Sequence, residues 1–126
     1  MSLREIFYIF TEGRNKREVV WFKSDYEIIR DGHGESHTAS HPEVETHFEV
    51  VKKAIEAPDE VKQDTAYKNR KCYYTWFSGD GTYKNQHMKV VLKERFYGKL
   101  IVITAYFTPR FKEGEITIWN RIQNKN

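Results

Sequence analysis

Three histidines recur at four-residue intervals in one short stretch of this chain, as His33, His37 and His41. Imidazole is the side chain whose unperturbed pKa lies nearest neutrality, so it accepts or donates protons at physiological pH, and it is also a common metal ligand. The cluster therefore predicts a site of proton transfer or of metal binding. The alternative interpretation is a solvated polar loop in which three histidines fall together by chance.

A helix is expected directly after the histidines, because apolar residues recur at helical spacing from Val44 to Ile55. Ser40 and Glu43 fit a capping box at its start. Pro58 should end the helix, since proline disfavours helical geometry in the residue before it. His41 would then lie at the N-terminus of the helix, where backbone amides attract phosphate.

Strands are predicted on both sides of this helix. Before it, Ile6 to Phe10 and Val19 to Phe22 flank the turn-rich residues 11–15, a pattern typical of a β-hairpin. After it, an antiparallel meander is expected over Tyr67 to Phe77, His87 to Tyr97, Leu100 to Thr108 and a short final strand, Glu115 to Trp119. The predicted fold class is α+β, with an N-terminal hairpin and a helix packed on an antiparallel, mainly four-stranded sheet.

The composition favours one compact domain over residues 1–126, because a chain of this length suffices for a single hydrophobic core. No apolar stretch approaches the roughly 20 residues that cross a bilayer, and the start lacks the pattern of a signal peptide. A cytoplasmic protein without membrane association is expected. The single cysteine, Cys72, lies in an apolar and aromatic run and is interpreted as a buried side chain.

Positive charge is concentrated in the second half of the chain. Residues 1–57 carry 8 Lys and Arg against 11 Asp and Glu, whereas residues 58–126 carry 13 against 7. From His87 to Tyr97, basic side chains alternate with apolar ones, so one strand face meets the core and the other is cationic. That face is suited to a phosphate backbone, although lysines on a solvated sheet also serve solubility. Neighbouring aromatic residues, among them Tyr74, are candidates for base stacking.

Several short motifs follow one another in a defined order. They are His37, then His41-Pro42-Glu43-Val44 at a helix start, Ala57-Pro58-Asp59-Glu60-Val61 after the helix, the strand Lys89-Val90-Val91 and the strand Ile101-Val102-Ile103-Thr104-Ala105-Tyr106. This order resembles the phage and toxin branch of the barnase/EndoU/colicin/RelE-like (BECR) nuclease superfamily over residues 30–120. The resemblance implies metal-independent cleavage of RNA with no cofactor, by a phage-borne or toxin-type effector restrained by a protein inhibitor or antitoxin.

Cleavage of RNA without a metal requires a base for the 2′-hydroxyl, an acid for the leaving 5′-oxygen and groups that stabilise the charged phosphate. His41 is the candidate base and His37 the candidate acid, although these roles are interchangeable. The remaining candidates are Lys89, Thr104 and Tyr106 for stabilising the transition state, and Arg70, Lys93, Arg95 and Tyr74 for binding the substrate.

Two other functions remain open at this point. If residues 33–41 were helical, three imidazoles would align on one face and, with water, form the ligand set of a zinc hydrolase. Alternatively, the basic and aromatic sheet holds nucleic acid or a protein partner without catalysis.

Overall fold

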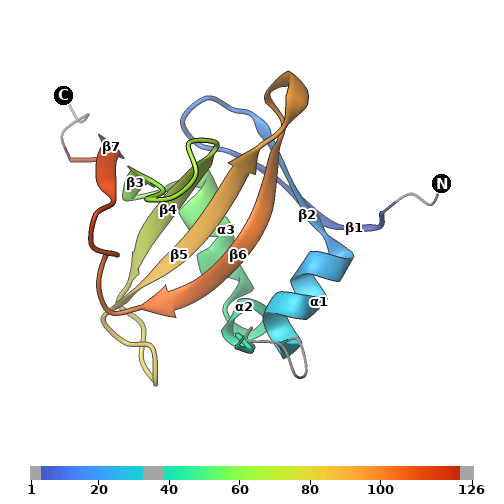
Figure 1. Cartoon of the computed structure of the whole chain (residues 1–126). Helices are drawn as coiled ribbons and strands as arrows, with labels where there is room; N and C mark the ends of the chain where they lie inside the picture. Colours follow the sequence, from blue (N-terminus) through green and yellow to red (C-terminus); the bar gives the residue numbers. More distant parts are fainter. Residues whose placement is uncertain (1–3, 33–38, 123–126) are drawn as a thin grey trace.

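In the computed structural model, which describes residues 4–32 and 39–122, the chain forms seven strands and three α-helices (Figure 1). The strands are β1 (Ile6–Thr11), β2 (Glu18–Phe22), β3 (Glu60–Gln63), β4 (Arg70–Phe77), β5 (Gln86–Glu94), β6 (Leu100–Thr108) and β7 (Ile116–Asn120). The helices are α1 (Lys23–Asp31), α2 (Glu43–Thr46) and α3 (Phe48–Glu56), and a 3₁₀ turn, Phe96–Gly98, joins β5 to β6. The α+β class is confirmed.

All seven strands belong to one mixed sheet in the order β1-β2-β6-β5-β4-β3-β7. Neighbouring strands are antiparallel except β2 and β6, which are parallel and pair Val19 with Leu100 and Val20 with Ile101. The expected sheet of mainly four antiparallel strands is therefore too small. These four side chains are buried, so the hairpin gains apolar contacts by pairing with the meander. The unpredicted strand β3 lies between β4 and β7 in the sheet.

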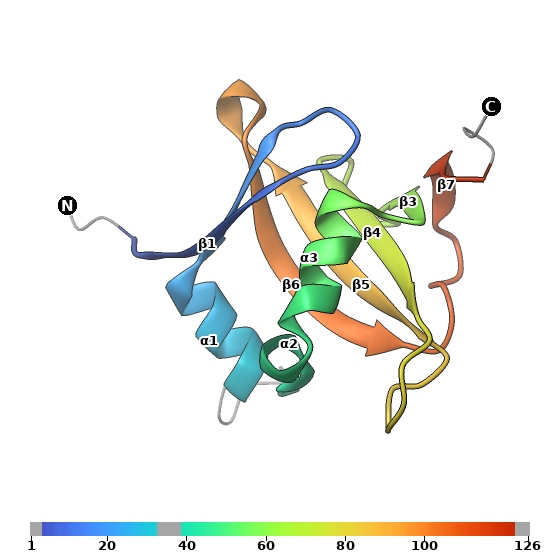
Figure 2. The same cartoon turned by 180° about the vertical axis from the view of Figure 1, so that it is seen from behind.

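Helix α3 covers one face of the sheet, lying behind it in Figure 1 and in front of it in Figure 2. Its apolar stripe of Val51, Ala54 and Ile55 is buried in the same core as Met88 and Val90, which alternate along β5. None of the three helices in the described chain covers the opposite face of the sheet, which we call the outer face.

The helix expected after residue 43 is divided at His47, whose φ of −123° and ψ of 40° are not helical. The imidazole of His47 packs edge-on against the rings of Phe77, Tyr83 and Phe107. The break in the helix thus coincides with the residue whose ring packs into this aromatic group. The short α2 that results is a single turn.

The predicted capping box of Ser40 and Glu43 is wrong. Pro42 occupies the N-cap position of α2, and no described side chain caps this helix. The Glu43 carboxylate instead accepts a hydrogen bond from the Phe107 amide at 3.3 Å, on the side of β6 that the short pairing with β2 leaves uncovered. A long-range contact with the sheet thus takes the place of the local cap.

Helix α1 is an element that the sequence patterns did not predict. It buries only Tyr26 and Ile29, so its apolar stripe is too short to stand out. It ends at Gly32, whose φ of 81° favours glycine. His33 and His37 follow within residues 33–38, outside the described residues. No helix in the described part of the chain is long and apolar enough to span a bilayer.

Candidate functional site

Most of the candidate residues share the outer face of the sheet. Side chains alternate along a strand, and the strand register sets Tyr74 of β4 beside Lys89 of β5, and Lys89 beside Tyr106 of β6. By the same alternation, the outer face consists of Arg70, Cys72, Tyr74 and Trp76 on β4, His87, Lys89, Val91 and Lys93 on β5, and Thr104 and Tyr106 on β6. The predicted alternation of side chains along these strands therefore agrees with the structure, and it places these candidate residues on the same face.

His41 lies beside the outer face, next to β6. Its amide donates a hydrogen bond to the Ile29 carbonyl of α1 at 2.7 Å, and its ring stacks on Tyr106 with 5.2 Å between ring centroids. Its Nδ1 lies 3.4 Å from Oε2 of Glu43, whose side chain is 5% exposed, whereas the His41 side chain is 28% exposed. A buried carboxylate thus orients this imidazole while part of the ring remains accessible.

Lys89 lies near the middle of the outer face and is buried. Its Nζ forms an ion pair of 2.8 Å with Oε2 of Glu115, which reaches the face from the segment between β6 and β7. The fully buried Glu115 side chain also accepts hydrogen bonds from the Tyr74 hydroxyl at 2.5 Å and from the Cys72 thiol at 3.3 Å. Lys89 Nζ lies 5.8 Å from the ring centroid of Tyr106, so this ring connects the ion pair with the imidazole beside β6.

The buried network changes the ionisation of its members. Burial, together with the hydrogen bond to Glu115, raises the pKa of Tyr74. Burial by itself lowers the pKa of Lys89, but the Glu115 carboxylate and the neighbouring hydroxyl and thiol groups outweigh it, so the pKa of Lys89 is raised overall. Lys89 is therefore an ammonium whose charge Glu115 balances, so it adds little net positive charge to the outer face.

Alkaline pH should destabilise the protein through Cys72. Burial raises the pKa of this thiol to about 12, against about 8.5 in an unfolded chain. The folded state holds the proton more tightly, so this contribution is complete below about pH 8.5 and falls by about 1.4 kcal/mol per pH unit as the pH rises through the folded pKa. Urea unfolding across this range measures the decline.

Cys72→Ala is the matched variant for this experiment. It removes the thiol proton, so its stability should begin to fall only at about pH 10, where tyrosine hydroxyls titrate in an unfolded chain. A wild-type free energy of unfolding that stays level between these two onsets would contradict the buried, protonated thiol.

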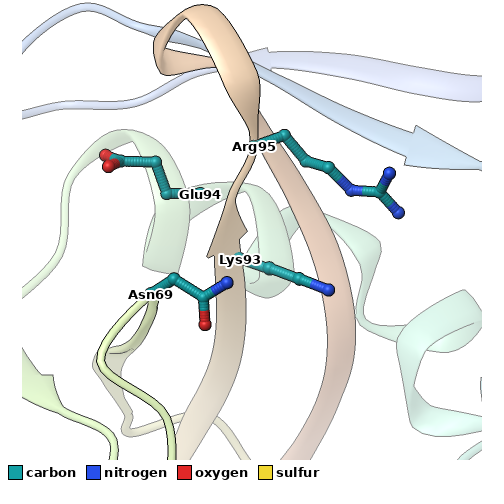
Figure 3. Close-up of a pocket in the computed structure, with 4 residues that line it drawn as sticks. All are labelled: Asn69, Lys93, Glu94 and Arg95. Carbon is teal, nitrogen blue, oxygen red and sulfur yellow. The ribbon is translucent and has the colours of Figure 1, made fainter.

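A pocket of about 490 Å³ opens at the C-terminal end of β5. The described residues that line it are Asn69, Lys93, Glu94 and Arg95. In Figure 3, Lys93 and Arg95 direct their cationic ends to the same side, whereas Glu94 points away and pairs with Arg17. Arg70 is the strand partner of Lys93, and its buried Nε has no hydrogen-bond partner among the described residues. This end of the face is suited to an anion.

The structure thus brings the candidates together in two neighbouring places. Tyr106 contacts His41 and is the strand partner of Lys89, with Thr104 two residues away on the same face of β6, and Arg70, Lys93 and Arg95 gather at the pocket end of β5. Thr104 is half-buried, and Tyr74 is fully buried with its hydroxyl bound to Glu115. The acid candidate, His37, lies outside the described residues.

Residues 4–32 and 39–122 contain no group of three or more His, Cys, Asp or Glu side chains placed to hold a metal ion. Two of the three histidines on which the zinc alternative depends, His33 and His37, lie in the segment between these ranges. The zinc alternative therefore remains a prediction.

Two carboxylates of this site were not among the sequence candidates. Glu115 stands in a polar segment that is typical of a solvated loop, and its partner Lys89 is 26 residues away. Glu43 was interpreted as a capping residue, although it binds the Phe107 amide across 64 residues. The spacing of His41 and Glu43 was the one local signal, because a carboxylate two residues from an imidazole is within reach of its ring.

No protein-family model, curated protein or solved structure matches this chain. The function is therefore inferred from the geometry of the outer face and from the chemistry of its residues.

Proposed function

We propose that the outer face binds single-stranded RNA and that the protein cleaves this RNA without a metal, by attack of a 2′-hydroxyl on the adjacent phosphate. The observation that carries the proposal is the setting of His41, which is paired with the buried Glu43 carboxylate, stacked on Tyr106 and partly open to solvent. Positioned imidazoles are the groups most often used for proton transfer to and from reacting oxygens.

His41 acts as the general base in this proposal. With Nδ1–H directed at Glu43, Nε2 is the unprotonated nitrogen that accepts the 2′-hydroxyl proton, and the carboxylate stabilises the imidazolium that forms. The 2′-oxygen bonds to phosphorus as the bond to the 5′-oxygen breaks, which leaves a 2′,3′-cyclic phosphate and a 5′-hydroxyl. His37 is retained as the proposed acid that protonates the leaving oxygen.

The phosphate groups of the RNA need both hydrogen bonds and positive charge. The Tyr106 and Thr104 hydroxyls and the ammonium of Lys89 supply hydrogen bonds to the reacting phosphate. Net positive charge comes from Lys93 and Arg95, since the charge of Lys89 is balanced by Glu115. Lys93 is four residues from Lys89, about 14 Å along an extended strand, so the pocket holds a different phosphate of the same RNA strand.

Incubation of the purified protein with RNA of mixed sequence in excess chelator tests this function. Cleavage should continue, and the new ends should carry 2′,3′-cyclic phosphates, because the attacking oxygen belongs to the substrate. Cleavage that stops on chelation and returns with zinc would instead favour hydrolysis by a metal-activated water at the three histidines.

The buried Lys89–Glu115 pair favours one alternative, a module that binds RNA without cleaving it. Because Glu115 balances the cation nearest Tyr106, less charge stabilisation is available to a transition state at this point of the face. Such a module would retain RNA intact, with an affinity that falls with salt by a log-log slope of about −0.7 per neutralised phosphate on a single strand. Recovery of uncut RNA from the complex distinguishes the two functions.

A further inference from the structure

Three aromatic rings form a cluster on the outer face at the N-terminal end of β5. His87 lies 4.8 Å from Trp76 and 4.6 Å from Phe111, measured between ring centroids. Trp76 is the strand partner of His87 on β4, whereas Phe111 comes from the segment between β6 and β7. We call these three residues the aromatic platform.

The platform is unlike the aromatic residues of the core, because two of its rings face solvent. Trp76 is 42% exposed and Phe111 is 40% exposed, whereas Trp21 and Tyr73 are buried in the core. Lys62 Nζ lies 4.4 Å from the centroid of Phe111, so one face of this ring is already occupied. Within the platform, Trp76 is therefore the ring most accessible to a flat ligand.

The platform also contains one polar atom without a hydrogen-bond partner among the described residues. This atom is Nδ1 of His87, and it is buried. Burial lowers the pKa of His87, despite the opposing influence of Asp59 and Glu60, so the ring is neutral at physiological pH. A neutral imidazole adds an aromatic ring to the platform without adding positive charge.

The position of the platform relates it to the proposed reaction site. His87 precedes Lys89 by two residues on the same face of β5, which is about 7 Å along an extended strand. One extended nucleotide bridges such a separation. The basic pocket of Lys93 and Arg95 lies beyond Lys89 in the opposite direction.

We propose that Trp76, His87 and Phe111 form a nucleobase subsite that stacks the base of a nucleotide next to the one whose phosphate reacts. Stacking on an aromatic ring accepts every base, because each has a π-face, and it suits single strands whose bases are unpaired. This inference rests on the proposed function for the identity of its ligand, RNA. It also predicts how the RNA lies along β5, with a stacked base at the N-terminal end of the strand and a bound phosphate at the C-terminal end.

Binding of a short 2′-O-methyl RNA tests the subsite, because this RNA lacks a free 2′-hydroxyl and remains uncut. Trp76→Ala and Phe111→Ala should each weaken binding by roughly 5- to 150-fold, the usual range for loss of a base-stacking ring. Trp76→Phe keeps an aromatic ring and should retain most of the affinity for RNA. Trp76→Leu keeps apolar volume but has no ring, so it should lose affinity as Trp76→Ala does. Thermal unfolding of each variant checks the fold, and the leucine variant replaces the alanine variant if the latter is unfolded.

Tyr97→Ala is the matched control, because Tyr97 is a fully exposed aromatic side chain on the turn between β5 and β6, away from the platform. It should bind like the wild type. An abasic residue scanned along the RNA should weaken wild-type binding most at one position, and Trp76→Leu should remove that dependence.

The outcomes separate this subsite from the proposed function. Equal binding by wild type, Trp76→Leu and Phe111→Ala overturns the subsite even if RNA is cleaved. Loss of binding in these variants, in a protein that leaves ordinary RNA intact, supports the subsite and overturns the cleavage activity.

Discussion

His41→Ala should slow RNA cleavage by about 10²- to 10⁴-fold, which is the usual contribution of a positioned acid or base. The protein should still fold, because His41 is partly exposed and Glu43 keeps its hydrogen bond from the Phe107 amide. The variant loses the contact with Glu43 and the stacking on Tyr106, the latter worth about 0.5–1.5 kcal/mol. Single-turnover cleavage of a labelled RNA, with urea unfolding of the same preparation, measures both effects.

A second histidine provides the control for this experiment. His47 lies in the described chain on the core side, against Phe77, Tyr83 and Phe107. His47→Gln should therefore reduce stability while the folded fraction cleaves RNA at the wild-type rate. Equal rates for wild type and His41→Ala would remove His41 from the chemistry, and an equal loss in both variants would point to damage to the fold.

Lys89→Met should destabilise the protein by about 3–5 kcal/mol, because it leaves the buried Glu115 carboxylate without its cation. Proteins of this size are stable by only about 5–15 kcal/mol, so this change is among the largest expected from one side chain. Glu115→Gln should also destabilise the protein, because it leaves the buried Lys89 ammonium without its carboxylate. The double variant should recover part of the loss, and urea unfolding of all four proteins gives the coupling free energy.

The ion pair of Lys23 and Glu5 is the matched control, since both of its side chains are largely exposed. Lys23→Met should change the free energy of unfolding by less than about 1 kcal/mol. A similar small change in Lys89→Met would contradict the burial of the pair on the outer face.

The elements that the sequence predicted well are those with strong local periodicity. The strand from Leu100 to Thr108 was predicted with its observed bounds, and the apolar stripe of α3 was recognised from its spacing. The number of strands in the sheet was underestimated, because β3 and the pairing of β2 with β6 depend on partners that are distant in sequence. β3 is only four residues long, and the parallel pairing of Val19 and Val20 with β6 joins segments about eighty residues apart in the chain.

Strand alternation correctly predicted which candidate residues share a face of the sheet. Period two alone places Lys89 and Lys93 on one face of β5, and Thr104 and Tyr106 on one face of β6. The carboxylates that bind near these residues could not be predicted from local sequence patterns, because they are distant in the chain. Glu115 binds Lys89 only because the segment before β7 folds over the sheet, and Glu43 turns to β6 rather than to its own helix.

A single 2′-deoxy substitution in an RNA strand tests most directly whether the attacking oxygen belongs to the substrate. The substitution is placed at a mapped cleavage site, and the rate there is compared with the rate at an unmodified site in the same strand, in excess chelator. The proposed mechanism predicts that cleavage disappears at the modified site only, because no 2′-oxygen remains for His41 to activate. Undiminished cleavage at the deoxy position would contradict it, and would assign the attack to water.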